Sequence, residues 1–86
     1  MTIDEYNLMR HAIGFSRKKV KRNKYVASRN YFCAAINTPD CSDWFDLCQF
    51  GYAKMCEERE RACYFTVTEK GIEYIERQEK CKIQVE

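Results

Sequence analysis

A run of positive charge constrains this chain more than any other feature. Residues 17–29 hold seven Lys and Arg side chains and no Asp or Glu. Like charges at this density repel one another, and no carboxylate within the run would let one of them enter a core as an ion pair. We therefore expect an exposed, irregular basic loop over residues 15–30, with folded elements on either side of it.

The rest of the chain is acidic. Outside the run, eight basic residues stand against all thirteen acidic ones, a net charge of −5 within a total of +2. An asymmetry of this kind indicates an oriented electrostatic interaction. Nucleic acid and an acidic protein surface are the usual partners of such a basic segment.

The segment before the run is predicted to be a helix over about residues 3–13. Thr2 and Glu5 form a capping-box pattern, apolar residues then recur at helical spacing up to Ile13, and Gly14 supplies a C-terminal stop. After the run, the apolar and aromatic stretch 30–35 favours a short buried strand.

A second helix is predicted to begin at Thr38, which can act as its N-cap with Pro39 at the first helical position. Gly51 closes this helix. Its inner face is expected to be an apolar stripe that consists of Cys41, Trp44, Phe45 and Cys48.

Two extended runs, about 52–57 and 62–67, follow this helix, and the charged residues 58–61 between them suit a hairpin turn. Two registers are open. With a four-residue loop Cys56 lies opposite Cys63, whereas one residue of slip pairs Met55 with Phe65 and reverses the faces of the strand.

The last helix is predicted to run from Glu69 to about Lys80. Thr68 is its N-cap, and Ile72 and Ile75 form its inner face. The tail 81–86 alternates apolar and polar residues, so it is either one more short strand or a flexible end.

These elements predict one α+β domain over residues 1–86, in the order helix–strand–helix–β-hairpin–helix. Residues 64–71 resemble the junction that follows the wing in winged-helix domains. That resemblance implies a small winged-helix-like fold. Winged-helix domains usually place two consecutive helices before the wing, whereas here only one is predicted.

A second resemblance covers about residues 8–75. The chain is similar to a family of short phage and prophage proteins in Arg10-His11-Ala12-Ile13-Gly14, in Arg29-Asn30-Tyr31-Phe32, in a Trp-Phe-x-Leu helix that ends at Gly51, and in Phe65-x-Val67-Thr68-Glu69-Lys70-Gly71. The resemblance implies a phage or prophage origin. The family has no established activity that it would lend to this chain.

The basic run is the first candidate site. Its side chains can neutralise several phosphates, with a strong dependence on salt, and Tyr25 and Tyr31 can stack on bases. The simpler interpretation is a solvated loop that pairs with the domain's own acids. The candidate residues are Arg17, Lys18, Lys19, Lys21, Arg22, Lys24, Tyr25 and Arg29.

The second helix offers an alternative, acidic face through Asp40, Asp43 and Asp46. Three carboxylates would repel phosphate, so this helix is not expected to enter a DNA groove. The same face, with Glu57, Glu58 and Glu60, could imitate a phosphate track and occupy a host nuclease complex, as an anti-CRISPR-type inhibitor does. The simpler interpretation is a solvated helix face.

Several functions are not expected. The six cysteines include no close pair of the kind that zinc sites use, so we predict no metal and no cofactor. Buried thiols are the preferred interpretation in a reducing compartment; a zinc tetrad from distant positions and a Cys56–Cys63 disulfide are the alternatives. His11 is the only histidine, and nothing marks a cysteine that it would activate.

We therefore expect a non-enzymatic binding protein. No Gly-rich phosphate loop is present, and no small-molecule substrate is indicated. No stretch is long and apolar enough to span a membrane, and the N-terminus has no hydrophobic signal core, so we expect a cytoplasmic location in a host cell. Its partner is predicted to be nucleic acid or, alternatively, a protein of a host defence system.

Overall fold

The computed structural model describes residues 1–86 and shows a small mixed α+β domain. Its helices and strands follow the order α1 (Ile3–Ala12), the 3₁₀ turn η1 (Arg17–Lys19), β1 (Lys24–Ala27), β2 (Phe32–Ala35), α2 (Pro39–Gln49), β3 (Ala53–Glu58), β4 (Ala62–Val67), α3 (Glu69–Glu79) and β5 (Lys82–Val85).

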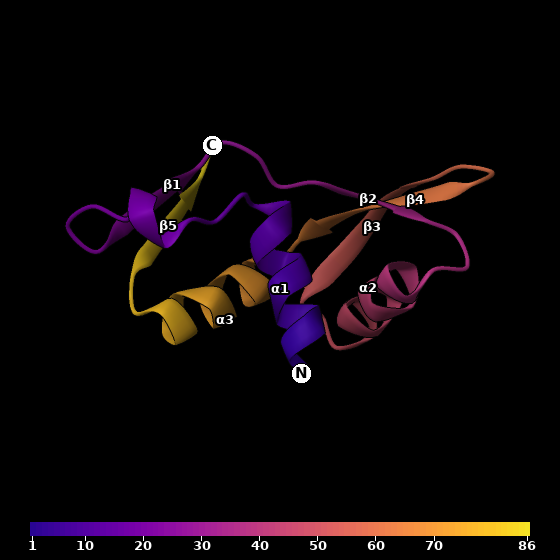
Figure 1. The fold of residues 1–86 in the computed structure, drawn as a ribbon, viewed down its shortest axis with the longest axis horizontal. Coiled ribbons are helices and arrows are strands. Elements are labelled where there is room, and N and C mark those ends of the chain that lie inside the picture. The colour runs from indigo at the N-terminus through magenta and orange to yellow at the C-terminus, as the bar shows by residue number, and fades with distance from the viewer.

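The strands form two separate sheets. A three-stranded antiparallel sheet has the order β2-β4-β3, and a two-stranded parallel sheet pairs β1 with β5. The domain measures 42 × 23 × 19 Å. Figure 1 shows β1 and β5 at one end of the long axis, α2 and the β3–β4 hairpin at the other, and α1 between them. Each of the three helices is too short and too polar to cross a lipid bilayer.

The predicted caps of α1 are confirmed. The Thr2 hydroxyl accepts from the Glu5 N–H, and the Glu5 carboxylate accepts from the Thr2 N–H at 2.9 Å. At the other end Gly14 has a φ of 65°, and the Phe15 N–H donates to the Arg10 carbonyl at 2.9 Å. This is a Schellman-type ending, which glycine favours because it has no Cβ to clash in that conformation.

The caps predicted for α2 and α3 are also present. The hydroxyl of Thr38 accepts from the Cys41 N–H, and that of Thr68 accepts from the Gly71 N–H. The predicted inner face of α2 was wrong at one position: Phe45 is 46% exposed. Leu47 is buried instead, beside Cys41 and Trp44, because the helix turns the 41–44–47 row toward the sheet.

The hairpin adopts the slipped register. Met55 lies opposite Phe65, and a bulge at Cys56 then places Glu57 opposite Tyr64 and Glu58 opposite Cys63. The register that would pair Cys56 with Cys63 is therefore wrong. The slipped register places the buried Ala53 opposite Val67 on the inner face of the sheet, where Trp44 also stacks on Phe65 with ring centroids 5.3 Å apart.

The sequence predicted an irregular basic loop over residues 15–30. This prediction is wrong in part, because the segment contains the turn η1 and the strand β1. Residues 24–27 form β1, which runs parallel to β5 with Lys24 beside Lys82. The pairing explains the strand, because Tyr25 and Ala27 are buried on one face while the charged and polar neighbours remain exposed. The tail thus contributes the strand that its alternation suggested.

Gly71 allows α3 to pack against the rest of the domain. A Cβ at this position would lie 2.3 Å from the Tyr52 carbonyl oxygen and 2.5 Å from a Val67 methyl group. The Tyr52 oxygen belongs to the backbone and also accepts from the Thr68 N–H at 3.0 Å, so it cannot easily move. Glycine in the first turn of a helix costs less than in its middle, so helix propensity does not require or exclude it here, whereas the packing requires it.

We predict that Gly71→Ala destabilises the fold by about 2–3 kcal/mol, because the added methyl group must displace backbone. Chemical denaturation of the two proteins measures the change. Helix propensity alone predicts the opposite sign, a gain of up to about 1 kcal/mol. The exposed α3 substitution Gln78→Ala is the control, and an unchanged or raised stability of Gly71→Ala would contradict the steric explanation.

Candidate nucleic-acid interface

Three segments of the chain bring cations together at one end of the domain. These segments are η1 with the turn before β1, strand β1 itself, and the junction between α3 and β5. We call this surface the basic end; its exposed members are Arg17, Lys18, Lys19, Lys21, Arg22, Lys24, Lys80 and Lys82. Figure 1 shows these segments together at the end of the long axis opposite α2.

Lys80 and Lys82 are the members that sequence reasoning missed. The β1–β5 pairing sets Lys82 beside Lys24, and the Lys82 N–H donates to the Asn23 carbonyl at 2.8 Å. Lys80 ends α3 in the left-handed conformation, with a φ of 56°. The alternation of the tail indicated a strand, but no local signal shows which strand a parallel partner will be.

The basic end includes an open hollow of about 450 Å³ between η1 and β1. Its walls hold the side chains of Lys18, Lys19, Lys21 and Lys24, together with Tyr25 and Val26. Four ammonium groups around one concave surface raise the local positive potential. This is an arrangement that favours a polyanion over a neutral ligand.

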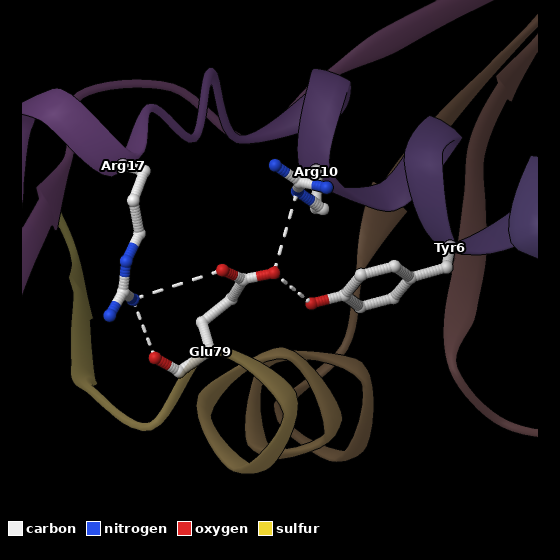
Figure 2. Close-up of polar contacts among 4 residues, drawn as sticks. All are labelled: Tyr6, Arg10, Arg17 and Glu79. Carbon is white, nitrogen blue, oxygen red and sulfur yellow. Dashed lines mark hydrogen bonds and ion pairs between the residues drawn. The ribbon is translucent and has the colours of Figure 1, made fainter.

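Two carboxylates near the basic end, those of Glu79 and Glu76, have partners within the domain; a third, that of Glu73, lines a hollow with Lys80 and Lys82. In Figure 2, Glu79 of α3 accepts from the Tyr6 hydroxyl at 2.7 Å and lies 3.8 Å from both Arg10 and Arg17. Arg17 also donates to the Glu79 carbonyl oxygen. Glu76 accepts from the Ile83 N–H at 2.7 Å. Glu79 and Glu76 thus hold the basic segment and the tail against α3. Of the eight cations of the basic end, only Arg17 forms an ion pair.

The Glu79 network is partly shielded from water. The Arg10 guanidinium lies over the rings of Tyr6 and Phe15, 5.6 and 5.5 Å from their centroids. Burial, and then the hydrogen bond to Glu79, raises the pKa of Tyr6 well above its usual value of 10.0. Tyr6 therefore remains a hydrogen-bond donor across the physiological range and keeps Glu79 in place.

Two predicted site residues have structural roles instead. Tyr25 is 4% exposed, and its hydroxyl donates to the Gly14 carbonyl, so it cannot stack on bases. Arg29 lies apart from the basic end: its guanidinium donates to the His11 carbonyl at 2.8 Å. The positive charge of Arg29 stabilises the C-terminal end of α1, because the guanidinium donates to a carbonyl of the last turn and lies at the negative end of the helix dipole. Tyr31, the residue before β2, is exposed but packs on Tyr64 of the neighbouring strand β4.

The acidic face predicted on α2 is extended by α1. Carboxylate oxygens of Glu5, Asp43 and Asp46 all lie within 4.8 Å of one another, and Glu5 is buried. Burial, followed by the charges of Glu5 and the neighbouring acids, raises the pKa of Asp43. These oxygens are the ligand type that Mg²⁺ and Ca²⁺ prefer, but a cluster of carboxylates alone does not define a cation site.

The cysteines differ in their surroundings, and only Cys41 and Cys63 interact with each other through their side chains. Cys41, Cys63 and Cys81 are buried, and Cys33 and Cys56 are exposed, and all six are free thiols. Burial raises the pKa of Cys41, Cys48 and Cys81, which disfavours the reactive thiolate. His11 is exposed, and its ring packs edge-on against that of Phe32 with centroids 5.6 Å apart.

We predict that Asp43→Asn stabilises the protein near neutral pH. A raised folded-state pKa means that the native state binds this proton more tightly than the unfolded chain does. Its contribution to stability is therefore present at low pH and lost as the pH rises. Denaturation at about pH 7 and about pH 4 should show a gain for Asp43→Asn that shrinks on acidification. An equal gain for Asp43→Asn at both pH values would contradict this explanation. So would a gain of the same size in the exposed control variant Glu60→Gln.

Comparison of the chain with protein-family models, with curated proteins and with solved structures found no match in any of the three. Function must therefore be inferred from the charges and contacts of the chain itself.

Proposed function

We propose that this chain is a non-enzymatic nucleic-acid-binding protein of phage or prophage origin, and that it binds through the basic end. The observation that carries the proposal is the segregation of charge. Eight exposed cations lie at one end of the long axis, and one of them is paired with an acid. Cations left free of internal partners retain their full attraction for phosphate.

The shape of the basic end supports contact with a phosphate backbone. Lysines line the hollow between η1 and β1, and Lys80 and Lys82 continue the positive surface onto the neighbouring strand. Lysine and arginine contacts to phosphate fix the position of a protein on nucleic acid but carry no sequence information directly. The core of this interface is thus electrostatic.

The winged-helix-like interpretation belongs to the same proposal, in modified form. The β2-β4-β3 sheet with α2 before the hairpin is compatible with it. The helix that would enter a groove in that fold is α2, which presents Asp40, Asp43 and Asp46. Phosphate would repel that surface, so the proposed contact is at the opposite end of the domain.

The non-enzymatic part of the proposal is supported by the thiols. Burial raises the pKa of Cys41 and of Cys81, which disfavours nucleophilic chemistry at these two thiols. A cytoplasmic location in the host cell, where free thiols persist and nucleic acid is available, fits the same picture.

A second candidate function uses the acidic face. Glu5 lies with Asp43 and Asp46 on this face, and none of Glu5, Asp40, Asp43 and Asp46 has a basic residue in ion-pair contact. Of the hairpin acids predicted to extend the face, Glu57 is paired with Arg59 at 3.1 Å. Such a surface can imitate phosphates and occupy a host nuclease complex, as an anti-CRISPR-type inhibitor does. We expect the triple variant Asp40→Asn, Asp43→Asn, Asp46→Asn to lose capture of such a complex in a pull-down. Equal capture by both proteins, or none by either, would remove this candidate.

The proposed function predicts salt-dependent binding to nucleic acid. Titration of labelled duplex and single-stranded DNA at about 50 mM and about 200 mM salt should show an affinity that falls steeply with salt. Changing Lys18, Lys19, Lys21 and Arg22 to Ala should reduce the slope of log K against log salt by about 2–4, because each lost phosphate contact removes about 0.9.

A matched pair of variants tests the location. Lys80→Ala with Lys82→Ala should weaken binding, whereas Arg59→Ala with Arg61→Ala, which removes the same charge from the distant hairpin, should have little effect. Absence of binding at low salt would refute the proposal. Binding that survives the four changes in the basic end would refute the role given to that surface.

A further inference from the structure

The turn at the outer end of the basic surface has an unusual backbone. Lys21 and Lys24 exchange both of their backbone hydrogen bonds, each 2.9 Å long, and so close a two-residue hairpin turn. Arg22 and Asn23 occupy its tip with φ values of 53° and 61°. Two successive positive φ angles define a type I′ turn.

Arginine at position 22 makes this turn less stable than Asn, Asp or Gly would. Type I′ turns favour Asn, Asp and Gly, because a long L-side chain is strained in the left-handed region. Arg22 is exposed and has no ion pair that would compensate for the strain. Strained backbone positions that contribute nothing to the core cluster at functional sites, so Arg22 is a candidate for a role at the surface.

The position of the turn suggests what that role is. Figure 1 shows the turn between η1 and β1 at the outer extremity of the domain, where no other element covers it. Only two residues form the tip, and the flanking Lys21 and Lys24 lie directly opposite each other. The minor groove of B-DNA, about 6 Å wide, admits a single extended side chain at such a tip, while a phosphate backbone lies on either side.

We propose that this turn inserts Arg22 into the minor groove of duplex DNA, with Lys21 and Lys24 on the phosphates that border the groove. The proposal rests on the proposed function and gives it a duplex partner and a specificity. Arg and Asn are both side chains that proteins use in this groove, and Asn23 is the second residue of the tip.

We expect the protein to prefer duplexes that have a narrow minor groove. A-tracts have a narrow minor groove with an enhanced negative potential, which attracts an inserted arginine. Arginine suits this position better than lysine because a guanidinium is more weakly hydrated than an ammonium group. Duplex RNA should bind more weakly, because its minor groove is wide and shallow.

The test compares the full chain on three duplexes of equal length: A-tract DNA, G·C DNA and RNA. We expect the wild type to prefer A-tract DNA by about tenfold, and the minor-groove ligand netropsin to displace it. Arg22→Lys keeps the charge but should reduce the preference. Arg22→Asn should raise the unfolding midpoint, since Asn suits the turn, and should abolish the preference. Lys18→Ala, the control, should weaken binding to both DNA duplexes equally.

The outcomes separate the two proposals. Binding to none of the duplexes at low salt refutes the proposed function itself. Binding to all three with equal affinity, insensitivity to netropsin, or a preference that persists in Arg22→Asn refutes the role of the turn while nucleic-acid binding stands. Loss of the preference in a folded, more stable Arg22→Asn variant supports it.

Discussion

The parallel pairing of β1 with β5 is the interaction on which the rest of this structure depends. It joins a segment near the start of the chain to the last residues, and hydrogen bonds continue it at both ends, from Lys82 to Asn23 and from Glu86 to Ala27. Without this pairing, the like charges of residues 17–24 would hold that segment away from the domain. With it, Tyr25 and Ala27 enter the core, and the repulsion is confined to an exposed surface.

Glu79 completes this arrangement. One half-buried carboxylate binds a tyrosine hydroxyl and two arginines, and so connects α1, η1 and the end of α3 (Figure 2). These contacts give Glu79 a structural role, and its single negative charge offsets only a small part of the positive charge of the basic end. The domain is therefore a dipole along its long axis, with the carboxylates of α2 and Glu5 far from the cations. An oriented field of this kind steers an anionic partner toward one end.

Local signals in the sequence predicted much of the fold, because caps and turn residues act over a few positions. The caps Thr2, Thr38 and Thr68 and the ends at Gly14 and Gly51 are all confirmed. Long-range features were not predictable. No short-range pattern shows that β1 pairs with β5, that Gly71 must admit the Tyr52 carbonyl, or that Ala53 lies opposite Val67 in the hairpin. The same holds for the candidate site. The basic run was predictable from the sequence, whereas the contribution of Lys80 and Lys82 and the burial of Tyr25 depend on the pairing of β1 with β5.

We propose that the basic end, and not the acidic face, meets the partner. Chemical-shift mapping of the ¹⁵N-labelled protein during titration with a short A-tract duplex tests it most directly. We expect progressive shifts at the amides of residues 17–24 and 80–82, with the amides of α2 and Glu5 unchanged. Shifts centred on α2, or none at any residue at low salt, would contradict it.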